Sequence, residues 1–577
     1  MKKNMPLEGL RWSRDSGSAL YDTPQTAVLG RAGGGNGSGE NENGVGYATL
    51  SINLPTTNGT RAAGDPEFNP GDANEYDVKD VTLFIFKQAG SSENDYTFVE
   101  TADLGTMAPW VKDDDNKGIT TAATITAKLN KVDLTSTYYA LVVLNNKDKN
   151  NDLKVVEPST NQTYSDWNST TVADTKFADN TNGFYMANAP EFTTGGEPKT
   201  LVKIEKVYAT KQAAETNKAT TIHVERGLAK VTVGSLPKKL TATGKLYNED
   251  KVDITAWNLD VTNKSTYPIH KTAGLNDPFT TIWDASTAAA PSTGRFVDAT
   301  NTAFKRVYWG IDPNYDTDYK TVETCEGAFN VKAANAEITG DATTPQYCLE
   351  NTFDIKHMVQ GQTTRVVFKA KYTPKGFEDN ETFYKIGNNT ALWHKTDLED
   401  QIKAKAAEVL KVDVSKITVE LAATDNDLTK SGTKVLTSDN IQNDGTAVPD
   451  GDIAKINAKL GLTNATTTAP IVGIATYASG VSYYIARVKH FGNDLTPWNE
   501  GDLTYGDNDV DNNNKYLGRY GVLRNNWYDL TVQSVSGPGT PEVPTIKPEV
   551  PDDENDRYIN VSVKILDWAK RSQNVDL

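Results

Sequence analysis

Hydrophobic and polar residues alternate along this chain in short stretches, and turn residues separate the stretches. A period of two places every second side chain on the same face, so such stretches predict β-strands with one buried face. The predicted strands of the body cover residues 81–86, 138–144, 222–233, 252–261, 304–309, 365–372, 471–477, 481–488 and 527–535. Helices do not alternate regularly with them, which favours antiparallel β-sandwiches over a parallel α/β sheet.

One stretch has helical spacing instead. Thr396 and Glu399 have the spacing of a capping box, and apolar residues then recur along one side as far as Leu410. This pattern predicts a helix over residues 396–410. A second, shorter helix is predicted over residues 452–460.

A further strand is predicted near the N-terminal end, at residues 47–54. Its apolar face consists of Ala48, Leu50, Ile52 and Leu54. The preceding residues 31–46 are rich in Gly, Ser and Asn, as is typical of a flexible tether. The residues that follow, 55–77, are polar and contain Arg61 as their single basic residue. A polar segment with no apolar face is open to proteases.

The C-terminal end repeats this arrangement. Residues 536–557 contain many prolines and acidic residues and predict an extended linker. A strand is predicted beyond it, at residues 558–568. Its apolar face consists of Ile559, Val561, Val563 and Ile565.

The two terminal strands have two interpretations. In the simpler one, each strand belongs to the sheets of its own molecule. In the other, the first strand plugs a hydrophobic groove until the chain is cut after Arg61, and the last strand of another copy then fills the groove. Such a contact is head-to-tail and builds a filament. The pattern alone leaves both interpretations open.

The charge of the chain excludes one class of partner. The 577 residues contain 59 Lys and Arg against 76 Asp and Glu, which gives a net charge of −17. A strongly negative protein repels polyphosphate, so nucleic acid is not an expected partner.

The cysteines and histidines give no sign of a metal site or a nucleophile. Cys325 and Cys348 are the only cysteines. A disulfide between them and two unpaired buried thiols are both compatible with the sequence. The five histidines are widely spaced and form no zinc-binding or nucleophilic motif. We therefore expect no enzyme activity, no cofactor and no metal.

Two acidic clusters, 113–115 and 507–512, carry oxygen ligands of the kind that calcium binds. The second cluster lacks the glycine and the glutamate of a calcium loop. We interpret both clusters as solvated turns.

Several segments, taken in order, resemble a known family. They are GYATLSINLPTTNGTRAAGD at 46–65, ERGLAKVTV at 225–233, QYCLENTFD at 346–354, TRVVFKAKYTPK at 364–375, GVLRNNWYDLTVQSVSGPGTPEVP at 521–544 and VSVKILDWAKRSQNVDL at 561–577. Together they resemble the Bacteroidales fimbrillins, the subunits of type V pili, and in particular the major fimbrillins of short fimbriae. The similarity extends from about residue 46 to the end of the chain.

This resemblance implies a mainly β fold of two transthyretin-like β-sandwich domains with a few short helices and a C-terminal donor strand. It also implies export as a lipoprotein to the outer membrane and cleavage by an arginine-specific protease, here after Arg61. The strand that is lost would be residues 47–54, and the donor strand would lie near 558–568. Family members begin with a signal that ends in a cysteine, whereas this chain has neither an apolar leader nor a cysteine before Cys325. We therefore expect that its start is misassigned or that its export segment is missing.

These observations predict five regions. Residues 1–46 are a leader and tether, 47–61 the plug strand and cleavage loop, 62–235 an N-terminal β-sandwich domain, 236–536 a C-terminal β-sandwich domain, and 537–577 a linker with the donor strand.

The expected function is that of a structural shaft subunit of a cell-surface fimbrium, active in adhesion and biofilm formation. Its expected partners are other copies of itself, accessory fimbrillins, an arginine-specific protease, and receptors on host or bacterial surfaces. The competing interpretations are a monomeric glycan-binding surface lipoprotein, an accessory or tip adhesin, and a secreted hydrolase that uses a pair of carboxylates.

Overall fold

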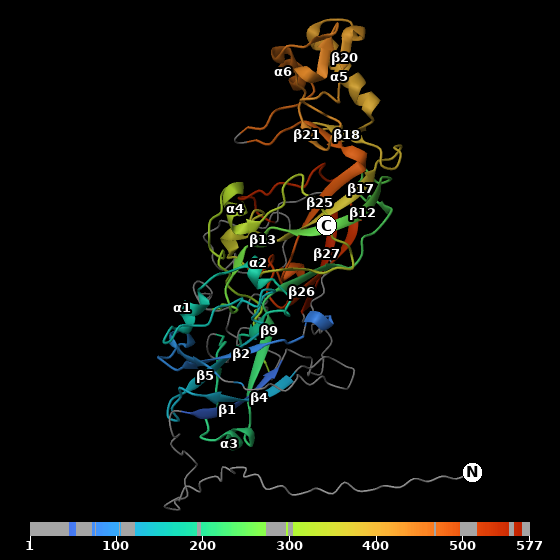
Figure 1. The fold of residues 1–577 in the computed structure, drawn as a ribbon. Helices are drawn as coiled ribbons and strands as arrows, with labels where there is room; N and C mark the ends of the chain where they lie inside the picture. The colour runs from blue at the N-terminus through green and yellow to red at the C-terminus, as the bar shows by residue number, and fades with distance from the viewer. Residues whose placement is uncertain are drawn as a thin grey trace, which may run out of the picture. The chain divides into compact units, whose positions relative to one another are not determined.

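The structure is a computed structural model, and strands dominate it, as predicted (Figure 1). It describes residues 45–53, 72–75, 77–102, 104, 122–192, 198–272, 296–297, 304–466, 469–496, 516–552 and 559–567. The mainly β fold class is therefore confirmed. Two strand pairs, β1 with β9 and β10 with β26, run parallel, which the antiparallel prediction did not include.

The N-terminal part is built on one eight-stranded sheet with the order β3-β2-β5-β7-β9-β1-β4, and β8 also pairs with β5. Its strands are β1 (Gly46–Asn53), β2 (Val81–Lys87), β3 (Thr97–Thr101), β4 (Ala122–Leu129), β5 (Tyr138–Leu144), β7 (Met186–Asn188), β8 (Val202–Lys203) and β9 (Thr220–Arg226). Three short helices accompany them, α1 (Tyr164–Asn168), α2 (Asp174–Phe177) and α3 (Lys211–Glu215). One hydrophobic core unites the inward side chains of these strands.

The C-terminal part contains a sandwich of two four-stranded sheets. The first has the order β16 (Gln346–Cys348), β10 (Ala229–Val233), β26 (Asn526–Val535) and β27 (Ile559–Asp567). The second has the order β11 (Leu240–Thr241), β12 (Lys251–Asp260), β17 (Arg365–Thr373) and β25 (Val481–Arg487). Both sheets contribute to a second core, which begins at Ala229, whereas Leu228 still belongs to the first. The change of core thus falls slightly upstream of the predicted boundary at residue 235.

Short paired strands and helices complete the region around the two cores. The pairs are β13 (Thr262–Asn263) with β15 (Phe329–Asn330) and β14 (Ser265–Thr266) with β6 (Val172–Ala173), and the helices are α4 (Val322–Ala328) and α7 (Gly492–Leu495). The pair β14–β6 joins a segment that follows β12 to the N-terminal part of the chain.

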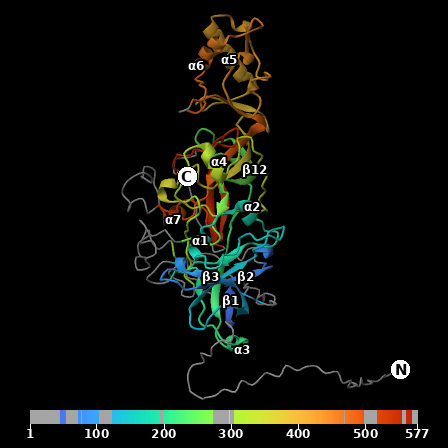
Figure 2. The same cartoon turned by 60° about the vertical axis from the view of Figure 1, so that its left-hand side comes forward.

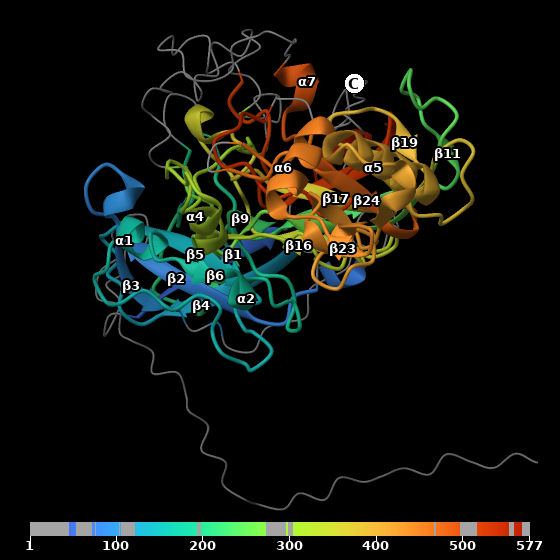
Figure 3. The same ribbon diagram turned by 90° about the horizontal axis from the view of Figure 1, so that it is seen from above.

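A separate α/β module is inserted between β17 and β25. These two strands pair directly, with Lys371 opposite Val481, so residues 374–480 form a long excursion at one end of the pair. Its elements are β18 (Phe383–Ile386), β19 (Leu392–Trp393), α5 (Lys395–Leu410), β20 (Ile417–Val419), β21 (Gly432–Lys434), β22 (Ile441–Asn443), β23 (Thr446–Ala447), α6 (Asp450–Lys459) and β24 (Ile474–Tyr477). The helices α5 and α6 lie side by side (Figures 2 and 3). The module has a core of its own, which the sequence analysis did not predict.

Most predicted elements are present, and two predictions were wrong in detail. The predicted strand at 222–233 is two strands, β9 and β10, which belong to different sheets. The predicted strand at 304–309 is not a strand: only isolated bridges occur there, at Arg306 and Val307. Trp309 is fully buried in a small aromatic cluster. The side chains of this apolar run therefore pack in a core, although its backbone does not form the continuous hydrogen bonds of a strand.

Candidate functional site: the first and the last strand

The first strand, β1, lies in the interior of its sheet. It pairs antiparallel with β4 over all of Gly46–Asn53 and parallel with β9 over its second half, where Asn53 lies opposite His223. In the sheet order β4 is the terminal strand and β1 is its neighbour. Removal of β1 would therefore separate β4 from β9 and leave two unpaired edges.

The apolar face of β1 points into the N-terminal core. Ala48, Leu50 and Ile52 are each about 1% exposed. Burying Leu50 and Ile52 contributes roughly 1.5–3 kcal/mol each. On the other face, the hydroxyls of Thr49 and Thr126 lie 3.0 Å apart across the β1–β4 pair.

The start of β1 is fixed by a close approach to a neighbouring segment. The backbone groups of Tyr47 and Tyr208 bond to each other in both directions, each at 2.8 Å. A Cβ at Gly46 would lie 2.9 Å from a methyl group of Val132 and still closer to Val207. Glycine at this position lets the strand enter the sheet beside these two valines.

Both ends of the segment that contains Arg61 return to strand β9. Asn53 pairs with His223 at one end, and Arg226 Nε donates a hydrogen bond of 2.6 Å to the carbonyl oxygen of Glu75 at the other. His223 and Arg226 are three strand positions apart, which is roughly 10 Å at about 3.3 Å per residue. Residues 54–71 could span several times that distance. The segment is therefore much longer than the connection requires.

The last strand, β27, lies at an edge of the C-terminal sheet. It pairs antiparallel with β26 (Figure 1). The register of this pair shifts at a bulge between Val532 and Ser534. It is the terminal strand of the order β16-β10-β26-β27. Within the described part of the chain, β27 thus has one neighbouring strand in its sheet, whereas β1 has two.

The register places the predicted donor residues opposite core positions of β26. Ile565, Val563, Val561 and Ile559 lie opposite Tyr528, Leu530, Val532 and Val535, respectively. These four residues of β26 are all buried. Directly opposite residues of an antiparallel pair project to the same face of the sheet. The alternating pattern of β27 therefore matches that of the strand it joins.

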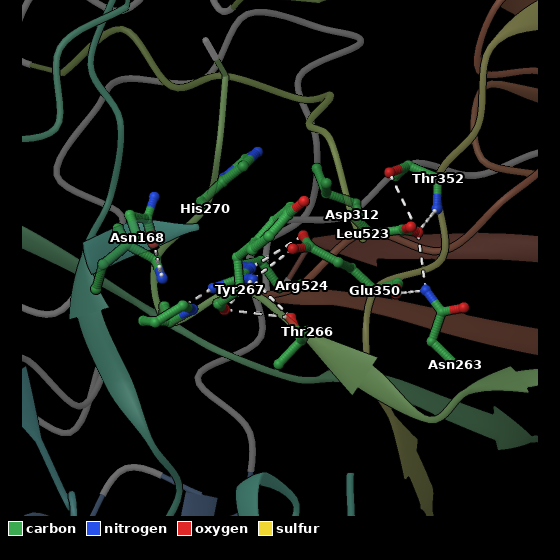
Figure 4. Close-up of polar contacts among 12 residues, drawn as sticks. Asn168, Asn263, Thr266, Tyr267, His270, Asp312, Glu350, Thr352, Leu523 and Arg524 are labelled. Carbon is green, nitrogen blue, oxygen red and sulfur yellow. Dashed lines mark hydrogen bonds and ion pairs between the residues drawn. The ribbon is translucent and has the colours of Figure 1, made fainter. Parts of the chain in front are cut away.

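A buried polar junction lies directly before β26 (Figure 4). Arg524 Nε donates to Glu350 Oε2 at 2.9 Å, and the same guanidinium also donates to the hydroxyl of Thr266 at 3.0 Å and to the carbonyl oxygen of Tyr267 at 3.1 Å. Because Thr266 belongs to β14, this network connects the start of β26 to the segment that pairs with β6. Asn168, at the end of α1, accepts a hydrogen bond of 2.8 Å from the backbone N–H of Ile269.

A carboxyl group with a shifted pKa belongs to the same junction. Asp312 is about 1% exposed. Burial raises its pKa to about 7, although hydrogen bonds from Thr352, Asn314 and Asn263 oppose the shift. A buried carboxyl group keeps its proton because the charged form is poorly solvated.

The structure contains no disulfide between Cys325 and Cys348. Both are free, buried thiols, so the disulfide alternative is wrong. Cys325 packs with Phe329 and Ile546, whereas Cys348 belongs to the core of the C-terminal sandwich. Burial raises the pKa of Cys325 to about 11 and that of Cys348 to about 12, so neither is a reactive thiolate.

Some predicted site residues lie outside what the structure describes. Arg61 and Leu54 are outside the described residues, as are the side chains of Ile559, Val561, Val563 and Ile565. The acidic clusters at 113–115 and 507–512 are outside them too. Among the described residues, no group of His, Cys, Asp or Glu could hold a metal ion. None of the described helices is both long and apolar enough to cross a membrane.

The inserted module carries a surface hollow that sequence reasoning missed. Its volume is about 510 Å³, and it is lined by Ala391, Leu392, Trp393, Asp397, Asp400 and Gln401. Trp393 comes from β19, and the three polar residues come from the first turns of α5. The mixture of an aromatic ring with carboxylate and amide groups is unlike the apolar cores around it.

Comparison with known proteins identifies the C-terminal segment. Residues 475–574 match the family model described as major fimbrial subunit protein type IV, fimbrillin, C-terminal. This segment contains β25, β26 and β27. No curated protein matches the chain.

Solved structures with a similar course of the chain share little sequence with it. The structure of a putative cell adhesion protein from Parabacteroides distasonis ATCC 8503 is 9% identical, and the match covers 92% of this chain and 98% of that one with a TM-score of 0.37. A fimbrillin from Porphyromonas gingivalis W83 is 11% identical, with 91% and 99% covered and a TM-score of 0.34. At this level the likeness carries no argument about function.

The resemblance seen in the sequence motifs therefore rests on the C-terminal segment, where a family model reproduces it independently of any structure. That segment includes both the edge strand β27 and the strand that binds it. The resemblance to the fimbrillins is thus confirmed for residues 475–574, which are similar to the C-terminal segment of that family.

Proposed function

We propose that this protein is a major shaft subunit of a cell-surface fimbrium and polymerises by protease-triggered strand exchange. An arginine-specific protease cuts after Arg61 and releases β1. The C-terminal strand of another copy then occupies the vacated position between β9 and β4. The precursor is an exported lipoprotein of the outer membrane, the polymer supports adhesion and biofilm formation, and the subunit performs no catalysis.

The position of β1 carries this proposal. A strand with two neighbours and an apolar face that is about 1% exposed leaves a deep, apolar gap when it is removed. Unpaired edges and exposed apolar surface favour the addition of another strand. The long connection between Asn53 and Asp72, with Arg61 as its single basic residue, gives a protease one place at which to release it.

The position of β27 also supports the proposal. A strand that fills such a gap needs apolar residues at every second position, as β27 has. Within its sheet β27 is a terminal strand beside β26. An edge strand can leave without dividing its sheet in two. The C-terminal sheet would retain β16, β10 and β26.

The test is cleavage of the full chain with trypsin followed by electrophoresis without heating. We expect intact chains to run as monomers and cleaved chains to form a ladder that resists SDS. The matched control is Arg61→Ala, which can still be cut at Arg31 in the tether but not between Asn53 and Asp72. A ladder of equal intensity from Arg61→Ala, or no ladder from the cleaved wild type, would contradict the proposal.

A second candidate function is that of an accessory or tip adhesin, or of a monomeric glycan-binding protein. The hollow on the inserted module favours it, because an aromatic ring beside carboxylate and amide groups suits a sugar. Screening the uncleaved chain and Trp393→Ala on a glycan array distinguishes the two functions. Binding that depends on Trp393 without any ladder after cleavage would favour this second candidate.

A further inference from the structure

The segment directly after residues 54–71 is held against the C-terminal sheet. Residues Asp72–Glu75 include the short 3-10 helix η2 (Ala73–Glu75), and the side chain of Glu75 is 0% exposed. We call residues 72–75 the clamp. The clamp precedes β2, which belongs to the N-terminal sheet, yet the side chains that bind it come mainly from the C-terminal one.

The clamp binds a buried lysine through two carboxylates. Glu75 Oε1 lies 2.6 Å from Lys230 Nζ, and Asp72 Oδ2 lies 3.3 Å from the same nitrogen. The hydroxyl of Tyr347 donates to Glu75 Oε1. The backbone N–H of Asp72 donates to Glu75 Oε2 at 2.8 Å, which fixes the carboxylate from its own segment.

The residues that bind Glu75 lie in one row across adjacent strands. Lys230 of β10 lies opposite Tyr347 of β16 and opposite Trp527 of β26. Its ammonium group lies 4.1 Å from the centre of the Trp527 ring. Trp527 in turn lies opposite Leu566 of β27. The clamp therefore rests on the same row of the sheet that binds the last strand.

The buried charge makes the clamp difficult to remove. The side chain of Lys230 is 2% exposed, and Glu75 and Asp72 of the clamp each place a carboxylate oxygen within 4 Å of its ammonium group. Taking one partner out of a buried ion pair is strongly destabilising. Loss of residues 72–75 would remove both of these carboxylates from a buried ammonium group in the sheet that carries β27.

We propose that the clamp stays with the mature subunit and sets the downstream limit of cleavage for proteases that also cut after lysine, because an arginine-specific protease meets no further arginine before Arg226. A cut after Arg61 leaves residues 72–75 in place, whereas a cut after Lys79 would remove them. The clamp thereby preserves the row from Tyr347 to Trp527 while β1 leaves. This inference rests on the proposed function, because β1 is released only if the chain is cut before the clamp.

Trypsin can test the limit because Lys79 offers it a second site. The side chain of Lys79 is 54% exposed. Its backbone N–H donates to Asn145 Oδ1 at 2.7 Å, with the clamp on its N-terminal side and β2 on its C-terminal side. We expect the wild-type full chain to yield a stable product that begins at Ala62. In Glu75→Gln the clamp should open, and the cut after Lys79 should become on the order of tenfold faster.

Two further variants keep the test decisive. Tyr347→Phe removes one hydrogen bond to Glu75 and should accelerate the cut after Lys79 by a smaller factor, so it carries the test if Glu75→Gln does not fold. Asn74→Ala is the matched control, because Asn74 is an exposed residue of the same segment and its change should leave the cut after Lys79 as slow as in the wild type. Intact-mass spectrometry of the products measures each rate.

A second measurement separates the clamp from the exchange itself. A labelled peptide of residues 557–570 is added to chains cleaved after Arg61, and its binding is followed by fluorescence anisotropy. We expect the wild type and Asn74→Ala to capture the peptide and Glu75→Gln to capture less of it. Failure of the cleaved wild type to capture peptide would overturn the proposed exchange. The cleavage rates after Lys79 would still test the proposed role of the clamp. Equal rates of cleavage after Lys79 in the wild type and all variants would overturn the proposed role of the clamp.

Discussion

The first and the last strand have the same alternating pattern but different surroundings. β1 is an interior strand with neighbours on both sides, whereas β27 is a terminal strand with one neighbour in its sheet. Both present four apolar positions in sequence. The difference teaches that the apolar face alone does not determine how firmly a strand is held: the number of neighbours also does.

This difference assigns unequal tasks to the two strands in an exchange. Release of β1 breaks pairings on two sides and exposes Leu50 and Ile52, so it requires an input such as cleavage of the chain. Release of β27 breaks pairings on one side. Four predictions, in order of decreasing effect on strand exchange, test this comparison.

Deletion of residues 558–577 should abolish polymerisation altogether. The donor strand is then missing, while β26 remains paired with β10, so the monomer should stay folded. Electrophoresis without heating after trypsin cleavage, together with circular dichroism of the monomer, measures both outcomes. Ladders that persist after this deletion would show that another segment supplies the incoming strand.

Leu50→Ala should destabilise the uncut chain by about 2–5 kcal/mol, because it opens a cavity in the N-terminal core. The same substitution should have no effect once the chain has been cut and β1 has left. Denaturant unfolding before and after cleavage measures the two values, with Ser51→Ala, on the opposite face of β1, as the control. A cost that remains after cleavage would mean that β1 stays in place.

Val563→Ala should have a larger effect in the polymer than in the uncut monomer, the opposite of what is expected for Leu50→Ala. In the uncut monomer the substitution acts on an edge strand and should cost less than Leu50→Ala. In the polymer it should lower the temperature at which ladders dissociate, because the incoming strand loses about 1–2 kcal/mol of apolar burial. Ser562→Ala is the control, since it lies on the other face by the register. Ladders of unchanged thermal stability would place Val563 outside the gap.

Local patterns in the sequence predicted much of this fold. Period-two alternation located β1, β2, β5, β12, β17, β25, β26 and β27 within about two residues, and the helical spacing of apolar residues located α5. The predicted capping box at Thr396 was wrong, because α5 begins at Lys395 with His394 as its N-cap and no side-chain capping bond. These elements depend on neighbours in the sequence, which a pattern records.

What the sequence did not predict depends on contacts between distant residues. The inserted module closes its own core from short strands that begin and end within a few residues, and such strands have no clear period. The clamp binds through Glu75 to a lysine and a tyrosine that are far from it in the chain, and no local pattern connects the three residues. In the run 304–309, apolar residues pack into an aromatic cluster. Their spacing in the sequence resembles that of a strand, so the pattern predicted one.

The smallest expected effect on strand exchange concerns pH and separates the surroundings of β26 from those of β1. Burial raises the pKa of Asp312 from its ordinary value of 3.8 to about 7. Between these values the folded chain binds more protons than the unfolded chain, so the free energy of unfolding should fall as the pH rises, by at most about 1.4 kcal/mol per pH unit. Asp312→Asn should remove this contribution. Because Asp312 binds Thr352 and Asn263 rather than residues of β1, the contribution should be the same before and after cleavage. Unfolding in denaturant from pH 4 to pH 7 measures it, and a contribution that vanishes on cleavage would mean that the junction and β1 are coupled.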